Sequence, residues 1–378
     1  DVVLVQVNSL AAFALNESIM PSLTAFAKNA FSHQSFYAQR GDSEGIYSAL
    51  TSLYAPLNEI NTEASYYTLA HLLKENGYNA SIYCAGIDAP LAKAMGFDAP
   101  KTGVDAKSAL TEAAALASNG QKDFVFVTVD AVSYPYIADG EGNATLTGNG
   151  VLNGYLNCAG YADKVLEGFL GSVSEDTTVI IYGTAPKLDE KFGTYGKEHK
   201  ALFENGFSYD QAYRTPLIIR GAKAQAIDKA FSFATVYDLY PTIAAYLGVK
   251  SNKVLISGEN ILSGKQSESE RFFAIQGDYK RGYFITESIY HLKPSEIATI
   301  YNKSTMEQIF EDYTASEKAV LDTINECEQA VATGFFGGKV SYEQLYADMP
   351  STEKLVLIKE QASGGGSLAS YKAFLSNN

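Results

Sequence analysis

Tryptophan is absent from the 378-residue sequence, and cysteine and histidine are rare, with three and four copies. The cysteines lie far apart, at Cys84, Cys158 and Cys327, and their number is odd. They imply neither a disulfide framework nor a CxxC metal site, and we expect each to be a small core residue. The histidines follow neither an HxH nor an HExxH spacing. The sequence therefore supplies few ligands for a histidine-rich metal centre.

Basic residues and long apolar runs are also scarce. Lysine and arginine total 29 against 43 acidic residues, for a net charge of −14, which argues against nucleic acid as a partner and for a well-solvated surface. No stretch approaches the ~18 consecutive apolar residues of a membrane-spanning helix, and no signal peptide is present. Since Asp1 already stands on an expected strand, our hypothesis is an excised ectodomain whose leader or membrane tether is missing.

What the sequence does contain is a set of continuous apolar runs, which are typical of strands buried on both faces of a parallel sheet. The clearest are DVVLVQV at residues 1–7, DFVFVTV at 123–129 and TTVIIYG at 177–183. Apolar residues at helical spacing separate such runs, notably within residues 66–76, 105–119 and 150–173. The alternation predicts an α/β fold, and the length favours about two domains.

The composition of the sequence changes near residue 265. We interpret residues 263–270 as a linker, followed by short antiparallel strands at 271–276, 282–286 and 288–292 and a helix at 315–332. Shorter helices are expected at residues 342–347, 352–361 and 368–375. The predicted organisation is an α/β domain over residues 1–265 and a small α+β subdomain over residues 266–378.

The ends of the buried strands are the places where open α/β folds bind ligands. Asn8 follows the first run, and either a weak metal ligand or a plain turn residue explains it. Asp130 follows the second, as a ligand, a base or a solvated loop residue. Thr184, Ala185 and Pro186 follow the third, and they offer neither a carboxylate nor an imidazole.

A second candidate position is the start of a helix after Arg40-Gly41. Asp42 or Ser43 would cap this helix, whose free amides would face an anion or a nucleophile. A hydroxyl there suits covalent chemistry, but capping alone explains both residues equally well. The long loop after Pro186 carries His199 beside several acidic residues, and loops of this length are usually functional or mobile.

Several segments, in their order along the chain, resemble the alkaline phosphatase and sulfatase superfamily. The resemblance is to the extracellular domain of lipoteichoic acid synthases and related phosphoglycerol transferases. The matching pieces are VVLVQVNSL, MPSLTAFAK, SFYAQRG, LAHLLKENGYNASIY, MGFD, TTVIIYG, YRTPLIIRG and VYDLYPTIAAYLGV. They span residues 1–265, and they imply a doubly wound, mostly parallel sheet between helices in a bacterial, extracellular protein of the cell envelope.

The resemblance also implies a chemistry. Members of the superfamily use a divalent cation, usually manganese in the synthases and calcium in sulfatases, to activate a threonine nucleophile and neutralise phosphoryl charge. By resemblance, Asn8 stands where a carboxylate of the first strand is expected, and Thr184-Ala185 stands for an Asp-His pair. Ser133 stands for a substrate-side histidine, and the threonine segment is shortened to GDSEG, which leaves Asp42 or Ser43 near its position.

A dication that faced Asn8, Thr184 and Ala185 would have almost no anionic ligand. We therefore expect no metal cofactor and interpret the chain as a catalytically inactive member of the superfamily. Its role would be binding or scaffolding in the cell envelope, with a glycerol-phosphate polymer, a glycan or a protein as partner. The acidic net charge makes polyanions the less attractive of these.

Two alternatives stay open. The first is a divergent phosphate or sulfate ester hydrolase, or phosphoglycerol transferase, that uses manganese, calcium or zinc in a rebuilt centre. The residues available for that centre are Asp42, Ser43, Asp130 and His199. The second is a structural or adhesive module, which rests only on the Arg-Gly-Asp tripeptide at residues 40–42 and on the 26 tyrosines.

Overall fold

The computed structural model of the chain divides into two compact units that interleave along the sequence. The first unit contains residues 1–45, 78–89 and 98–230, and the second contains residues 46–77, 90–97 and 231–378. The structure describes residues 1–39, 42–56, 60–64, 66–84, 89–133, 136–137, 145–147, 150–186, 213–221, 224, 233–249, 255–263, 271–274, 284–286, 288–292, 299–305, 307–332 and 366–367. The domain boundary expected at residue 265 lies outside the described residues.

The first unit is built on a mixed sheet. Across the sheet its strands follow the order β4 (Lys101–Thr102), β3 (Asn79–Cys84), β5 (Asp123–Val129), β1 (Val2–Val7), β6 (Thr178–Gly183), β7 (Arg214–Arg220) and β2 (Phe31–Tyr37). The first five run parallel to one another, and β7 is antiparallel to both of its neighbours. Every residue of β1, β5 and β6 is buried. The expected mostly parallel sheet flanked by helices is confirmed.

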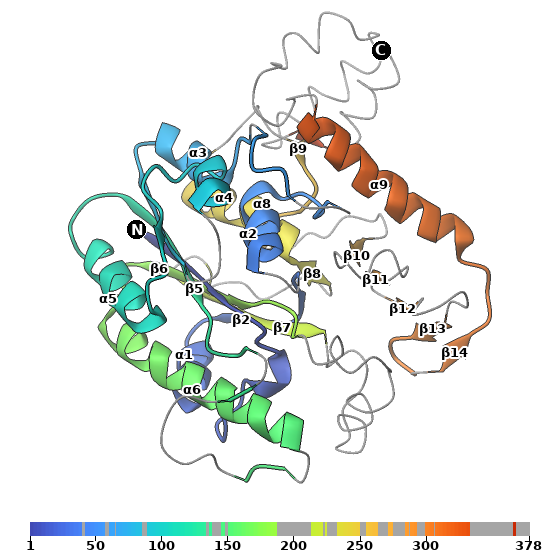
Figure 1. Cartoon of the computed structure of the whole chain (residues 1–378), viewed down its shortest axis with the longest axis horizontal. Helices are drawn as coiled ribbons and strands as arrows, with labels where there is room; N and C mark the ends of the chain where they lie inside the picture. Colours follow the sequence, from blue (N-terminus) through green and yellow to red (C-terminus); the bar gives the residue numbers. More distant parts are fainter. Residues whose placement is uncertain are drawn as a thin grey trace, which may run out of the picture. The chain divides into compact units, whose positions relative to one another are not determined.

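Helices α1 (Pro21–Lys28), α5 (Ala106–Leu116) and α6 (Gly150–Ser172) lie together against this sheet (Figure 1). The N-terminus of α1 lacks a cap from its own sequence. Asp163, which is buried in the middle of α6, accepts hydrogen bonds from the amides of Ser22 and Leu23 at 3.0 and 2.8 Å. A carboxylate of another helix therefore caps α1 and fixes it to α6.

Strand β2 starts four residues earlier than the stretch 35–39 that its sequence suggests. The pairing of β2 with β7 shifts register between His33 and Phe36. Such an irregularity interrupts the alternation of inward and outward side chains, so the pattern reveals only part of the strand.

The second unit combines short helices with a five-stranded antiparallel sheet of order β10-β11-β12-β13-β14. The strands of this sheet are β10 (Phe272–Ala274), β11 (Phe284–Thr286), β12 (Ile289–Leu292), β13 (Thr299–Asn302) and β14 (Gln308–Ile309). The second unit also contains the short strands β8 (Ala234–Thr235), β9 (Leu255–Ile256) and β15 (Gly366–Ser367). Its helices are α3 (Leu69–Glu75), η3 (Val236–Asp238), α8 (Leu239–Leu247), η4 (Ile261–Ser263) and α9 (Thr314–Ala332). Helices α2 (Asp42–Thr51) and α4 (Ala89–Ala94) begin in the first unit and continue in the second, and η1 (Ala12–Ala14) belongs to the first.

Several expectations for the second unit are confirmed, and others lie beyond the description. The antiparallel strands near residues 271–292 and the helix near residues 315–332 are present. The helices expected at 342–347, 352–361 and 368–375 lie outside the described residues. Of the linker expected at 263–270, Ser263 ends the short helix η4, and the rest lies outside the described residues. Cys84, Cys158 and Cys327 are buried and free, as expected. None of the described helices is long and apolar enough to cross a membrane.

Candidate functional site

The candidate site lies at the carboxyl ends of the parallel strands β5, β1 and β6. The amide of Asn8 donates to the carbonyl oxygen of Val129 at 2.9 Å, and the amide of Thr184 donates to that of Val7 at 3.0 Å. The amide of Ser9 donates to the Thr184 hydroxyl at 2.7 Å. Asn8 and Thr184 are thereby brought together, and their side chains are almost fully buried, with 1% and 0% exposed.

A chain of neutral hydrogen bonds occupies the interior of this site. The Tyr182 hydroxyl donates to Gln6 Oε1 at 2.5 Å, and Gln6 Nε2 donates to Asn8 Oδ1 at 2.9 Å. All three side chains are buried. Asn8 Nδ2 is buried as well, and among the described residues it has no hydrogen-bond partner. The side-chain oxygen of Asn8 therefore already accepts one hydrogen bond, from a neutral donor.

The start of helix α2 packs directly onto this chain. A Cβ atom added to Gly45 would lie 2.6 Å from Gln6 Oε1 and 3.0 Å from Thr184 Cγ2. Ser43 lies two residues earlier in the first turn of α2 and is half-buried. Asp42 is the first residue of α2, but its side chain is not described. A helix thus starts at Asp42, close to the expected position, and its first turn lies against the strand ends. That Asp42 or Ser43 caps this helix stays a prediction.

The loop after β1 and the residue after Thr184 are held by backbone contacts. Ser9 has a left-handed backbone, with φ of 58°. The hydroxyl of buried Tyr155 donates to the carbonyl of Ser9 at 2.8 Å and accepts from the amide of Ala11 at 2.7 Å, and burial raises its pKa. The buried Ala185 donates its amide to the Gln39 carbonyl at 2.9 Å and contributes only a methyl group. The site is therefore fixed and weakly polar.

The other candidate residues lie away from the buried chain of Tyr182, Gln6 and Asn8 or outside the described residues. Asp130 and Ser133 are both exposed, and the Ser133 hydroxyl donates to the Asp130 carboxylate. This pair follows β5, and neither residue forms a hydrogen bond with Tyr182, Gln6 or Asn8. His199 lies outside the described residues, so its expected contribution stays a prediction.

These groups do not fit a divalent cation. Manganese, calcium and zinc bind anionic oxygens, imidazole or thiolate. Among the described residues there is no group of three or more histidine, cysteine, aspartate or glutamate side chains that could hold a metal ion. Asn8 Nδ2 is a donor without a partner among the described residues, the Thr184 hydroxyl accepts a hydrogen bond from Ser9, and the Ala185 side chain has no ligand atom. A dication inserted beside Asn8, Thr184 and Ala185 would meet no carboxylate or imidazole among these three side chains to compensate its charge.

Sequence reasoning missed Gln6, Tyr182 and Gly45. Gln6 is the single polar residue of the run VVLVQV, and a buried polar side chain needs a partner, so this signal was available. Tyr182 and Gly45 carried no such signal, because the Tyr182–Gln6 pair joins residues 176 positions apart and depends on the register of two strands.

Replacing Tyr182 with phenylalanine is expected to lower the free energy of unfolding by about 1–3 kcal/mol, because Gln6 Oε1 loses a donor at 2.5 Å and both side chains are fully buried. Urea unfolding followed by circular dichroism measures the loss. Tyr161→Phe is the matched control, since Tyr161 is half-buried and its hydroxyl has no hydrogen bond with any described residue. Equal stability of the two variants would contradict the hydrogen-bonded chain.

The fold and parts of the sequence match known proteins. The sequence model of the sulfatase family matches residues 1–249. Lipoteichoic acid synthase 2 of Bacillus subtilis (strain 168) is 27% identical over 164 residues, which are 37% of this chain and 24% of that protein. The alignment thus spans about a quarter of the relative's length.

Solved structures resemble the chain over most of its length. The lipoteichoic acid synthase LtaP from Listeria monocytogenes has a TM-score of 0.69 at 17% identity, with 89% of this chain and 92% of that chain covered. A protein in the alkaline phosphatase superfamily from Vibrio parahaemolyticus has a TM-score of 0.65 at 18% identity, with 89% and 88% covered. The C-terminal periplasmic domain of EcEptC from Escherichia coli has a TM-score of 0.55 at 14% identity, with 75% and 91% covered. At these identities the likeness concerns the fold.

Proposed function

The chain belongs to the sulfatase family, and we propose that it is a member without catalytic activity that acts by binding or scaffolding. The observation that carries the proposal is the neutral chain of Tyr182, Gln6 and Asn8 at the strand ends where the family resemblance places a metal ligand. Without a cation, neither a nucleophile nor a phosphoryl group at this position receives charge stabilisation.

The start of helix α2 offers no other means of activating a nucleophile. A serine hydroxyl attacks an ester only when a base or a metal ion lowers the cost of its deprotonation. Among the described residues, none forms a hydrogen bond with the Ser43 hydroxyl, and Asp130 is hydrogen-bonded to Ser133 instead. The alternative of a rebuilt hydrolytic centre thus lacks a visible base–nucleophile pair within the described part of the chain.

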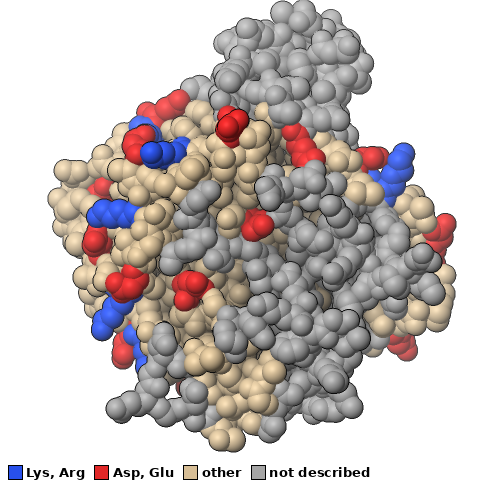
Figure 2. Space-filling model, viewed as in Figure 1, with Lys and Arg blue, Asp and Glu red and all other residues tan. Residues whose placement is uncertain are grey.

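The location that we propose is the outside of a bacterial cell, in the envelope. One relative is named a lipoteichoic acid synthase, and one structural neighbour is named a periplasmic domain. On the face drawn in Figure 2, the described basic side chains lie interspersed with acidic ones, and the whole chain carries a net charge of −14. These charges favour a glycan or a protein as partner over a glycerol-phosphate polymer.

Metal analysis tests the proposal. We expect the purified protein to retain no stoichiometric manganese, zinc or calcium and to show an unchanged melting temperature when each ion is added. A dication at one hundred times its Kd would add about 2.7 kcal/mol of stability, which a thermal shift assay detects easily. Stoichiometric binding that Asn8→Ala and Thr184→Ala both abolish would overturn the proposal.

An activity assay separates the proposal from its enzymatic alternative. Phosphate and sulfate ester cleavage by the wild-type protein is compared with cleavage by Ser43→Ala and Asp130→Asn. We expect no turnover above that of the buffer. Turnover that either substitution abolishes would establish a rebuilt active site and refute the inactive role.

A further inference from the structure

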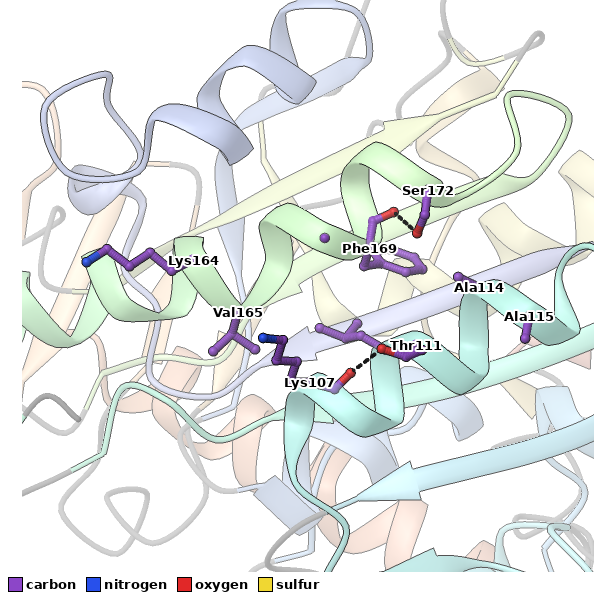
Figure 3. Close-up of a pocket in the computed structure, with 10 residues that line it drawn as sticks. Lys107, Thr111, Ala114, Ala115, Lys164, Val165, Phe169 and Ser172 are labelled. Carbon is purple, nitrogen blue, oxygen red and sulfur yellow. Dashed lines mark hydrogen bonds between the residues drawn. The ribbon is translucent and has the colours of Figure 1, made fainter. Parts of the chain in front are cut away.

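The groove between helices α5 and α6, of about 430 Å³, offers little apolar surface to a ligand (Figure 3). Leu110 and Phe169 in its floor are only 1% and 3% exposed, and Lys164 extends away from Lys107. A more specific arrangement lies in the sheet of the first unit, in strand β2. There a buried titratable side chain is combined with an irregular backbone.

Strand β2 is irregular where it faces a proline. His33 pairs with Leu217 and Phe36 pairs with Thr215, so the two residues between His33 and Phe36 lie opposite the single residue Pro216. Two residues against one is the count of a β-bulge. Proline has no amide hydrogen for the ladder, and a bulge is one of the few places in a sheet that tolerates it. The backbone groups of the two bulged residues therefore need partners outside the regular ladder.

A histidine side chain supplies one of these partners. The amide of Ser35 donates to Nδ1 of His33 at 3.0 Å. His33 is only 5% exposed, and Ser35 is half-buried. Because Nδ1 accepts a hydrogen bond, the imidazole is neutral and carries its proton on Nε2. The bulge in β2 therefore depends on the neutral form of His33.

The charges around His33 do not favour its protonation. Strand β7 and helix α1 are the elements of the first unit that pack most closely against β2. Their charged residues are all basic, with Arg214 and Arg220 at the two ends of β7 and Lys28 in the last turn of α1. Burial also disfavours a charged imidazole. The folded state therefore binds fewer protons here than the unfolded state, so stability falls as the pH decreases through about 6.5, where a free histidine titrates.

The part of β2 after the bulge leads to the candidate site. Phe36 and Tyr37 pair with β7 again, and both are fully buried. Two residues later, the carbonyl of buried Gln39 accepts the hydrogen bond from the amide of Ala185. A short stretch of backbone thus joins the bulge to the residue that follows Thr184.

We propose that His33 makes β2 an acid-sensitive element. Below about pH 6, protonation places a hydrogen on Nδ1, which then faces the Ser35 amide instead of accepting from it. The amide loses its partner, which favours a state in which β2 is open between the bulge and Gln39 and Ala185 has lost its acceptor. The proposal goes beyond the binding role assigned to the strand ends and does not depend on it.

Hydrogen exchange of the full chain, corrected for the intrinsic pH dependence of exchange, tests the proposal. From about pH 7.5 to about pH 5.5 the protection of residues 35–39 is expected to fall about tenfold, the ratio for an open state that titrates near pH 6.5 and a closed state that stays neutral. His33→Asn should keep its protection, because an asparagine oxygen accepts from the amide two residues on and does not titrate. His33→Leu has no acceptor and should be poorly protected at both pH values.

Two references make the result specific. The amides of β5, in the middle of the same sheet, should keep their protection over this pH range. His71→Asn removes a histidine of the second unit and should leave the response of residues 35–39 as in the wild-type protein. An equal loss of protection in β5 would indicate general acid unfolding, and a wild-type response in His33→Asn would assign the effect to another group. Either result would overturn the proposal.

Nitrogen-15 NMR of the histidine rings tests the premise without a substitution. At about pH 7.5 we expect the His33 ring to be neutral with its proton on Nε2, and we expect it to gain charge over the pH range in which residues 35–39 lose protection. A proton on Nδ1 at the higher pH, or a ring that is already charged there, would refute the acid-sensitive element.

Discussion

Replacing Asp238 with alanine is expected to lower the free energy of unfolding by about 3–5 kcal/mol. Asp238 is fully buried and accepts hydrogen bonds from the amides of Thr235 and Glu259, each at 2.7 Å. It also forms an ion pair with Arg271, whose side chain is only 11% exposed. The substitution removes the acceptor of two amides and the nearer of the two carboxylates that face the Arg271 guanidinium, which leaves the more distant Glu259 at 3.9 Å. Urea denaturation of the wild-type protein and the variant measures the effect.

The size of this effect follows from the charge left behind. Burial alone would lower the pKa of Arg271, but Asp238 and Glu259 together raise it above its usual range, so the guanidinium stays charged. Arg271→Met/Asp238→Ala should therefore lose less stability than the sum of the two single variants. Asp176→Ala, at an exposed aspartate, is the control and should stay within about 0.5 kcal/mol. A loss below about 1 kcal/mol for Asp238→Ala would contradict the structural role of the pair.

The parts of the fold that could be predicted from sequence are those that are set by burial on both faces. β5 spans the predicted residues 123–129, because a short apolar run rich in valine and phenylalanine is typical of a strand that is buried on both faces of a sheet. β2 was predicted only in part, because its register shift breaks the pattern. The interleaving of the two units depends on contacts between distant segments, and no local pattern encodes those.

The same division applies to the candidate site. Asn8 and Thr184 could be placed at neighbouring strand ends, because parallel strands present their carboxyl ends at one edge. The hydrogen bonds that fill the site could not be predicted. Which partner Gln6 finds depends on its pairing with Tyr182 across β1 and β6, and on how closely Gly45 of α2 approaches. By resemblance, the sequence alone predicts that metal ligands are absent at Asn8, Thr184 and Ala185, whereas the hydrogen bonds formed there are visible only in the structure.

Replacing Gly183 with alanine is expected to lower the free energy of unfolding by about 3 kcal/mol or more, at the upper end of the cost of overpacking. Gly183 ends β6 immediately before Thr184. A Cβ atom there would lie 2.1 Å from the carbonyl oxygen of Leu10 and 2.9 Å from Cδ of Pro216. Because the nearer atom belongs to the backbone of the loop after β1, a side-chain rotation cannot relieve the clash. Thermal and urea unfolding measure the loss.

The control is the same substitution at a position with free space. Gly171→Ala in α6 places its Cβ atom with no heavy atom within 4 Å, and alanine favours a helix over glycine by about 1 kcal/mol. Gly171→Ala should therefore be as stable as the wild-type protein or slightly more stable. If Gly183→Ala were equally stable, Leu10 would have moved without cost, and the loop that carries Asn8 and Ser9 would be loosely held. The side chains of Tyr182, Gln6 and Asn8 would then be free to separate and admit an ion. The structural reason for expecting no metal binding at this site would be lost.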